Sequence, residues 1–147
     1  MSYILTSIIQ KKIPFWNERV FTEDDLLNLC QIHHARHYED EEMKGKGEYT
    51  IHKGVCFVVV NKNLKSPEKL WVGLHELGHH LIHYPVPHRF SKGTKRRMDR
   101  EANFFAAIAL IPTSLIQDKS WCEIMEEYNY PRELIEIRQD IFDGYRI

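Results

Sequence analysis

The segment His75-Glu76-Leu77-Gly78-His79 constrains the fold of this chain more than any other. Two histidines lie four residues apart with a glutamate directly after the first, which is the H-E-x-x-H pattern of zinc hydrolases. On an α-helix four residues turn about 400° and rise about 6 Å, so His75 and His79 share one face and can share one metal ion. Glu76 lies about 100° round the helix, where its carboxylate can reach a metal-bound water without being a ligand. The pattern predicts metal-assisted hydrolysis; the alternative is a surface helix that is merely rich in histidine.

A helix around this motif is well marked. Ser66-Pro67-Glu68 supplies an N-cap, a proline for the first helical position and an acid in the first turn. Apolar residues then recur at spacings of three and four, as a helix buried along one side requires: Leu70, Leu74, Leu77 and Leu81. Pro85 and Pro87 end it. The sequence therefore predicts a long, half-buried helix that carries the histidines.

The third ligand must come from another element. His83 is on the same helical face, but eight residues span about 12 Å while zinc bonds nitrogen at about 2.0–2.1 Å. Residues 98–112 read as a second, mostly apolar helix that ends before Pro112. Glu101 lies near its start, and a metal ion would offset the cost of burying that carboxylate. Alternatively, Glu101 is a solvated first-turn acid.

Two other residues compete for the third position. Asp99 is a nearby acid, better suited to an N-cap or to a contact behind the ligands. His88 is a weaker option in a proline-flanked loop.

The two segments together resemble one family. His75-Glu76-Leu77-Gly78-His79-His80-Leu81-Ile82-His83, followed by Glu101-Ala102-Asn103-Phe104-Phe105-Ala106-Ala107 and Leu110-Ile111-Pro112, is similar to the ImmA/IrrE zinc metallopeptidases. The resemblance is strongest over residues 70–112. It implies that His75, His79 and Glu101 bind Zn²⁺ and that Glu76 is the general base, as in thermolysin-like enzymes.

The resemblance also implies a substrate. Family members are bacterial and phage proteins that cleave, or are thought to cleave, helix-turn-helix transcriptional repressors of mobile elements or stress responses. We therefore expect a zinc-dependent endopeptidase acting on such a repressor. The alternatives are a zinc-bearing protein that binds a repressor without cutting it, a DNA-binding regulator and a hydrolase of small molecules.

Composition agrees with a single enzyme domain. The chain has 147 residues, 43% of them hydrophobic, and a net charge of −1, so direct binding to nucleic acid is not favoured. Three widely spaced cysteines and no export or membrane signal predict a reduced, cytoplasmic protein.

The predicted fold class is α+β, a small zincin-like domain. The metal-binding helix and the third-ligand helix pack on a short antiparallel or mixed sheet. Residues 1–20 are expected to form an N-terminal arm that packs by its aromatics, residues 22–112 the catalytic core and residues 113–147 a helical C-terminal tail.

Within the core, a capped helix is expected over residues 22–34, then two strands over 48–52 and 55–60 joined at Lys53-Gly54. The second strand is nearly all apolar and is expected to be covered on both faces. If the first is an exposed edge, it would line the cleft and hold substrate as an added strand. His33, His34 and His37 with neighbouring acids allow a second metal site, although a solvated helix end is the simpler interpretation.

Residues 85–99 are expected to form a loop between the two metal-site helices. The cations in and next to it could dock an acidic substrate segment or simply be solvated: Lys92, Lys95, Arg96, Arg97 and Arg100. Four nearby side chains are candidates to stabilise the oxyanion: His80, His83, Tyr84 and His88.

The tail shows two short helical patterns separated by Asn129-Tyr130-Pro131. This helix–turn–helix outline is the basis of the DNA-binding alternative. Acids outnumber bases in the tail, the opposite of what a phosphate-facing element requires. We expect the tail to pack on the core or to form a platform for the partner.

Overall fold

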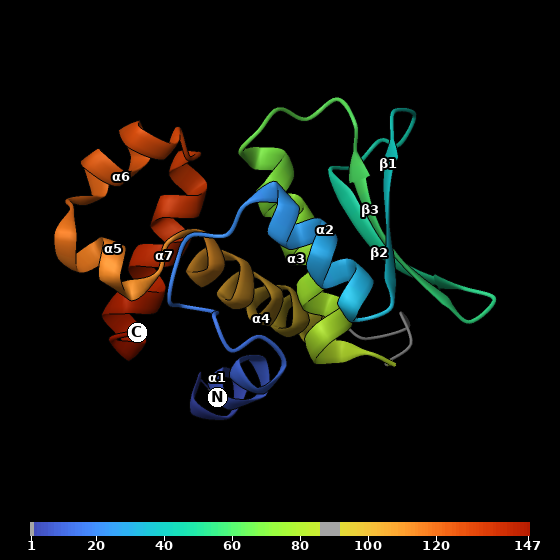
Figure 1. The fold of residues 1–147 in the computed structure, drawn as a ribbon, viewed down its shortest axis with the longest axis horizontal. Helices are drawn as coiled ribbons and strands as arrows, with labels where there is room; N and C mark the ends of the chain where they lie inside the picture. The colour runs from blue at the N-terminus through green and yellow to red at the C-terminus, as the bar shows by residue number, and fades with distance from the viewer. Residues whose placement is uncertain (1, 86–91) are drawn as a thin grey trace.

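A computed structural model describes residues 2–85 and 92–147 and confirms the α+β class (Figure 1). In chain order the elements are α1 (Ser2–Lys12), α2 (Glu23–Ile32), β1 (Ala35–Asp40), β2 (Gly47–His52), β3 (Val55–Asn61), α3 (Glu68–His83), α4 (Lys92–Leu110), α5 (Thr113–Asp118), α6 (Trp121–Tyr128) and α7 (Arg132–Tyr145).

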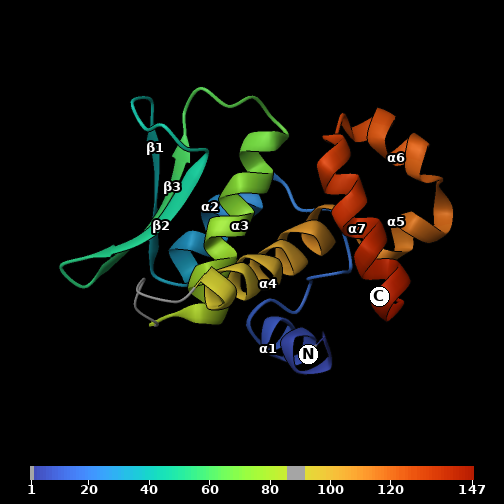
Figure 2. The same ribbon diagram turned by 180° about the vertical axis from the view of Figure 1, so that it is seen from behind.

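The sheet has three strands in the order β1-β3-β2, with β1 parallel and β2 antiparallel to β3. Strand β2, which contains the strand expected over residues 48–52, therefore lies at one edge of the sheet, so the condition set for a cleft-lining strand is met. Cys56, Val58 and Val60 are buried on one face of β3, whereas the alternate residues are only partly buried. Helices α2 and α3 lie on the buried face, and no other described element covers the opposite face (Figures 1 and 2). The prediction that both faces are covered is wrong.

The chain ahead of the sheet differs from expectation. Thr22 forms the expected capping box with Asp25, but α2 ends at Ile32 and His34 has a φ of 62°, which turns the chain into β1. The expected histidine-rich helix end is thus partly a strand. Among the residues that the structure describes, His33, His34 and His37 belong to no group of potential metal ligands, so they form no second site there.

The N-terminal arm packs by its aromatics, as expected. Trp16 is fully buried, and its indole Nε1 donates to the carbonyl oxygen of Phe105 at 3.0 Å. Helix α1 was not predicted, because the exposed apolar residues Tyr3, Ile4 and Ile8 stand next to the buried Leu5 and Ile9 and obscure the buried stripe.

Helices α3 and α4 cross at the centre of the molecule (Figure 2). Gly78 of α3 lies against Ala102 of α4 so closely that a Cβ on Gly78 would be 3.2 Å from the Ala102 Cα. Both helices start elsewhere than expected. Helix α3 begins at Glu68 with Pro67 as its N-cap and no side-chain cap, so Ser66 does not cap it. Helix α4 begins at Lys92, so most of the basic segment is helical rather than a loop.

The C-terminal tail contains three helices rather than two, and α7 packs against α4. The fully buried Arg138 of α7 donates to the carbonyl oxygens of Ile111 at 2.5 Å and Ile147 at 2.6 Å. The tail therefore packs on the core, one of its two expected roles. No described helix combines the length and apolar character needed to cross a bilayer.

Candidate metal centre

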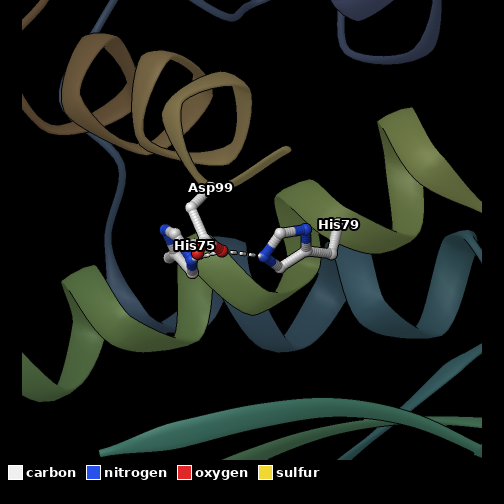
Figure 3. Close-up of side chains that lie close together, drawn as sticks. All are labelled: His75, His79 and Asp99. Carbon is white, nitrogen blue, oxygen red and sulfur yellow. Dashed lines mark hydrogen bonds and ion pairs between the residues drawn. The ribbon is translucent and has the colours of Figure 1, made fainter. Parts of the chain in front are cut away.

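Three side chains converge where α3 and α4 cross (Figure 3). His75 and His79 come from α3, and Asp99 reaches toward both from α4. The Asp99 Oδ1 atom lies 3.5 Å from His75 Nε2 and 3.1 Å from His79 Nε2. One nitrogen or oxygen atom from each residue lies within 4.8 Å of the other two, and within residues 2–85 and 92–147 no other group of three acids, histidines or cysteines does so. The arrangement suits a single metal ion.

The other ring nitrogen of each histidine is already bonded. His75 Nδ1 lies 2.8 Å from Asn103 Oδ1, and His79 Nδ1 lies 3.0 Å from His83 Nδ1. Both rings therefore turn their Nε2 atoms toward Asp99. Two imidazole nitrogens and one carboxylate oxygen are a donor set that zinc accepts, so the residues present fit this ion.

Glu101, the expected third ligand, lies elsewhere. Its Oε1 atom is 3.0 Å from His83 Nε2, and Glu101 is not part of the converging group. Residues two apart on a helix point about 200° away from each other, so Asp99 and Glu101 cannot face one ion together. The structure brings the competing acid, Asp99, to the histidines instead. His88, the other alternative, lies outside the described residues.

Both candidate ligand histidines are held in a form that can bind metal. Burial lowers the pKa of His75, and burial together with the neighbouring His75 and His83 rings lowers the pKa of His79 to about 4. Both imidazoles are therefore neutral near pH 7, with a lone pair available for a cation.

Glu76 lies beside these ligands in an enclosed position. Only 8% of the residue is exposed, and burial raises the pKa of its carboxyl group to about 8, with smaller contributions from Asp99 and Glu48. A Cβ built on Gly47 would be 3.1 Å from Glu76 Oε2, so the first residue of β2 passes directly over this carboxylate. Such a perturbed carboxyl group next to potential ligands is typical of a catalytic base.

A cleft of about 350 Å³ joins these groups. One wall is the start of edge strand β2, and the other is α4. The lining residues are Gly47, Glu48, Tyr49, His75, Glu76, His79, His83, Lys95, Met98 and Asp99. The expectation that the edge strand lines the cleft is confirmed.

Most of the expected oxyanion-stabilising groups are engaged or distant. His80 contacts Tyr49 Oη at 2.7 Å through Nδ1 and donates to the His33 carbonyl oxygen at 2.6 Å through Nε2. Tyr84 is 50% exposed and does not line the cleft, and His88 is outside the described residues. His83 lines the cleft, but both of its nitrogens are bonded.

The sequence reasoning missed Asn103 as a partner of His75 and Tyr49 as a lining group. Lys95 was noted only as part of a charged run. The sequence did allow Asn103 to be placed near the site, because it follows Asp99 by four residues and so shares the same face of the helix.

An α+β domain with this arrangement has the architecture of a small zincin-like metallopeptidase. Its features are two histidines and a glutamate on one helix, an acid on a crossing helix and an edge strand along the cleft. The model of the M78 peptidase family, described as the IrrE N-terminal-like domain, matches residues 30–140, and the chain therefore belongs to this family. The resemblance to ImmA/IrrE proteins is confirmed. No significant match to the chain is found among curated proteins or among solved structures.

Proposed function

We propose that this M78 peptidase is a zinc-dependent endopeptidase that cleaves a protein substrate. One observation carries the proposal: the Nε2 atoms of His75 and His79 converge with Asp99 Oδ1 beside the buried carboxyl group of Glu76. Membership of a peptidase family supports the reaction class.

The metal ligands we propose are His75, His79 and Asp99, with Asp99 in the place first expected for Glu101. A zinc ion bound there would supply Lewis acidity, lowering the pKa of a coordinated water and polarising the scissile carbonyl. The chain itself keeps the two imidazoles neutral and correctly turned, so little rearrangement is needed to bind the ion.

Glu76 is the proposed general base. It takes a proton from the attacking water and passes that proton to the leaving amide nitrogen. A cation next to His75 favours the ionised form of Glu76, which opposes the effect of burial on its pKa and leaves the group able to accept a proton near neutral pH. Its position beneath Gly47 directs it into the cleft rather than to bulk solvent.

Edge strand β2 is the proposed substrate-binding element. Its side away from β3 carries no partner strand among the described elements, so an extended peptide can pair with its backbone while its side chains occupy the cleft. Such pairing requires a locally unfolded or extended segment. A helix-turn-helix repressor with a flexible linker would meet this requirement, and we place the reaction in the cytoplasm, where such repressors act.

The test combines zinc content with cleavage. Purified wild type and Glu76→Gln are incubated with helix-turn-helix repressors from the source genome, and products are followed by mass spectrometry. We expect about one zinc per chain in both proteins, cleavage by the wild type and none by the variant. Glu126→Gln is a matched control, because it makes the same change at an exposed acid on α6 that does not line the cleft, and it is expected to retain cleavage.

Cleavage by Glu76→Gln would refute the assignment of the base. A second function, repressor binding without cleavage, predicts a different result. Glu76→Gln would then behave as wild type in repressor binding, whereas removal of zinc would abolish that binding.

A further inference from the structure

We propose that Glu101 and His83 form a positioning relay that orients His79 toward the metal ion. The proposal rests on the proposed function, because it assigns His79 to a zinc site. It gives Glu101 an indirect role: the carboxylate acts on the ion through two imidazole rings. The contacts are Glu101 Oε1 to His83 Nε2 at 3.0 Å, and His83 Nδ1 to His79 Nδ1 at 3.0 Å.

The direction of each hydrogen bond can be traced from the Glu101 carboxylate through His83 to His79. A carboxylate oxygen accepts, so His83 Nε2 donates to Glu101 Oε1. When that is the only proton on the His83 ring, His83 Nδ1 accepts from His79 Nδ1. In the metal-free protein Asp99 Oδ1, 3.1 Å from His79 Nε2, favours the opposite tautomer, with the proton on Nε2. The relay opposes that preference and favours the tautomer with a lone pair on Nε2, which is the one that can bind zinc at this position.

Burial makes the relay effective. His83 is only 9% exposed, and the side chain of Glu101 is 16% exposed. Little water can therefore compete for these hydrogen bonds, and a carboxylate left without a partner here would be costly. The hydrogen bond to His83 accounts for a largely enclosed acid at this position.

The sequence of α4 places a second support on the other histidine. Glu101 and Asn103 lie about 100° to either side of Ala102, the residue packed on Gly78. One contacts His83 and the other contacts His75. The helical turn after Asp99 therefore holds the rings of both proposed ligands. The Asn103 amide holds His75, and Glu101 holds His79 through His83.

Zinc affinity in a double-mutant cycle tests the proposal. The dissociation constant is measured by competition with a chromophoric chelator for wild type, Glu101→Ala, His83→Ala and the double variant. Loss of a group behind a metal ligand costs about 10–100-fold in affinity, so each single variant is expected to weaken binding by that factor. The double variant is expected to bind about as weakly as either single variant, since both changes break the same relay.

Two further variants calibrate the result. Glu101→Gln keeps an oxygen that accepts from His83 Nε2, so its loss of affinity is expected to be smaller than that of Glu101→Ala. Asp99→Ala removes a proposed ligand and is expected to lose more affinity than any relay variant. Circular dichroism at each step confirms that the variants are folded.

The tautomer of His79 provides a readout that does not depend on zinc. Long-range ¹H–¹⁵N spectra are recorded on metal-free Asp99→Ala, because Asp99 would otherwise favour a proton on His79 Nε2. They are expected to show His79 protonated at Nδ1, and a mixture of tautomers when Glu101→Ala is added.

Three results would overturn the relay. Additive losses in the double variant would mean that the two residues act independently. A loss in Glu101→Ala equal to that in Asp99→Ala would make Glu101 a direct ligand. An unchanged His79 tautomer when Glu101→Ala is added to Asp99→Ala would leave Glu101 and His83 with a purely structural contact. Failure of the proposed function gives a different result, because wild type would then bind no zinc. The spectra of metal-free Asp99→Ala, with and without Glu101→Ala, would still decide the relay.

Discussion

Replacing Glu76 by glutamine is expected to stabilise the zinc-free protein at alkaline pH while abolishing catalysis. Burial raises the pKa of the Glu76 carboxyl group to about 8 in the folded chain from its ordinary value of 4.5. Between these values the folded state keeps a proton that the unfolded state has released. Folding stability contributed by this group is therefore full at low pH and is lost as the pH rises toward 8.

The size of the effect follows from the difference between the two pKa values. Each pKa unit corresponds to about 1.4 kcal/mol, so the free energy of unfolding of wild type falls by roughly 4–5 kcal/mol at most across this range because of Glu76. Glutamine does not titrate. The advantage of Glu76→Gln over wild type is thus expected to be near zero at pH 4.5 and to grow to a few kcal/mol at pH 9.

Urea denaturation of both proteins in excess chelator, at intervals from pH 4.5 to pH 9, measures this difference. The lowest pH is an internal control, because there Glu76 is neutral in the folded protein and only half ionised in the unfolded chain, so a difference reflects mainly packing. All other titrating groups are common to the two proteins and cancel in the comparison. A difference that stays constant across the pH range would refute the claim that Glu76 is buried without a compensating charge.

Three other substitutions test the packing around the site, each by chemical denaturation. Gly78→Ala is expected to lower the free energy of unfolding by about 1–2 kcal/mol and to weaken zinc binding, because its methyl group must push Ala102 and α4 away by a few tenths of an ångström. Unchanged stability and zinc affinity would contradict the close contact between the two helices. Arg138→Ala is expected to cost about 3–4 kcal/mol, because it leaves a cavity and two carbonyl oxygens without their donor, and a loss below 1 kcal/mol would mean that the tail packs without it. Tyr49→Phe is expected to cost about 1–2 kcal/mol through the lost hydrogen bond to His80, and a neutral result would show that water replaces the hydroxyl.

The elements that carry the site were largely predictable. The leucine spacing predicted α3, the apolar run before Pro112 predicted the buried part of α4, and the turn at Lys53-Gly54 predicted the β2–β3 hairpin. These are local patterns with a fixed period, and the packed core agrees with them. Strand β1 was not predictable in this way, because its six residues include four charged or histidine side chains and it gains its place only by pairing with β3.

The choice between Asp99 and Glu101 could not be made from the sequence. Both acids lie near the start of the same helix, and only the angle at which α4 crosses α3 decides which of them faces the histidines. That angle depends on the contact between Gly78 and Ala102, which are far apart in the chain. The relative positions of His75, Glu76 and His79 were predictable, because all three lie on a single helix, α3.

The contact between Gly78 and Ala102 also sets how long the acid on α4 must be. With no side chain on one helix and a single methyl group on the other, the helix axes approach closely enough for an aspartate, whose carboxylate stands one carbon from the backbone, to reach between His75 and His79. Bulkier residues at the crossing would hold the helices further apart and would demand the extra carbon of a glutamate at position 99. The size of the residues at the crossing and the length of this acid both depend on the separation of the α3 and α4 axes. In related chains we therefore expect the two to change together.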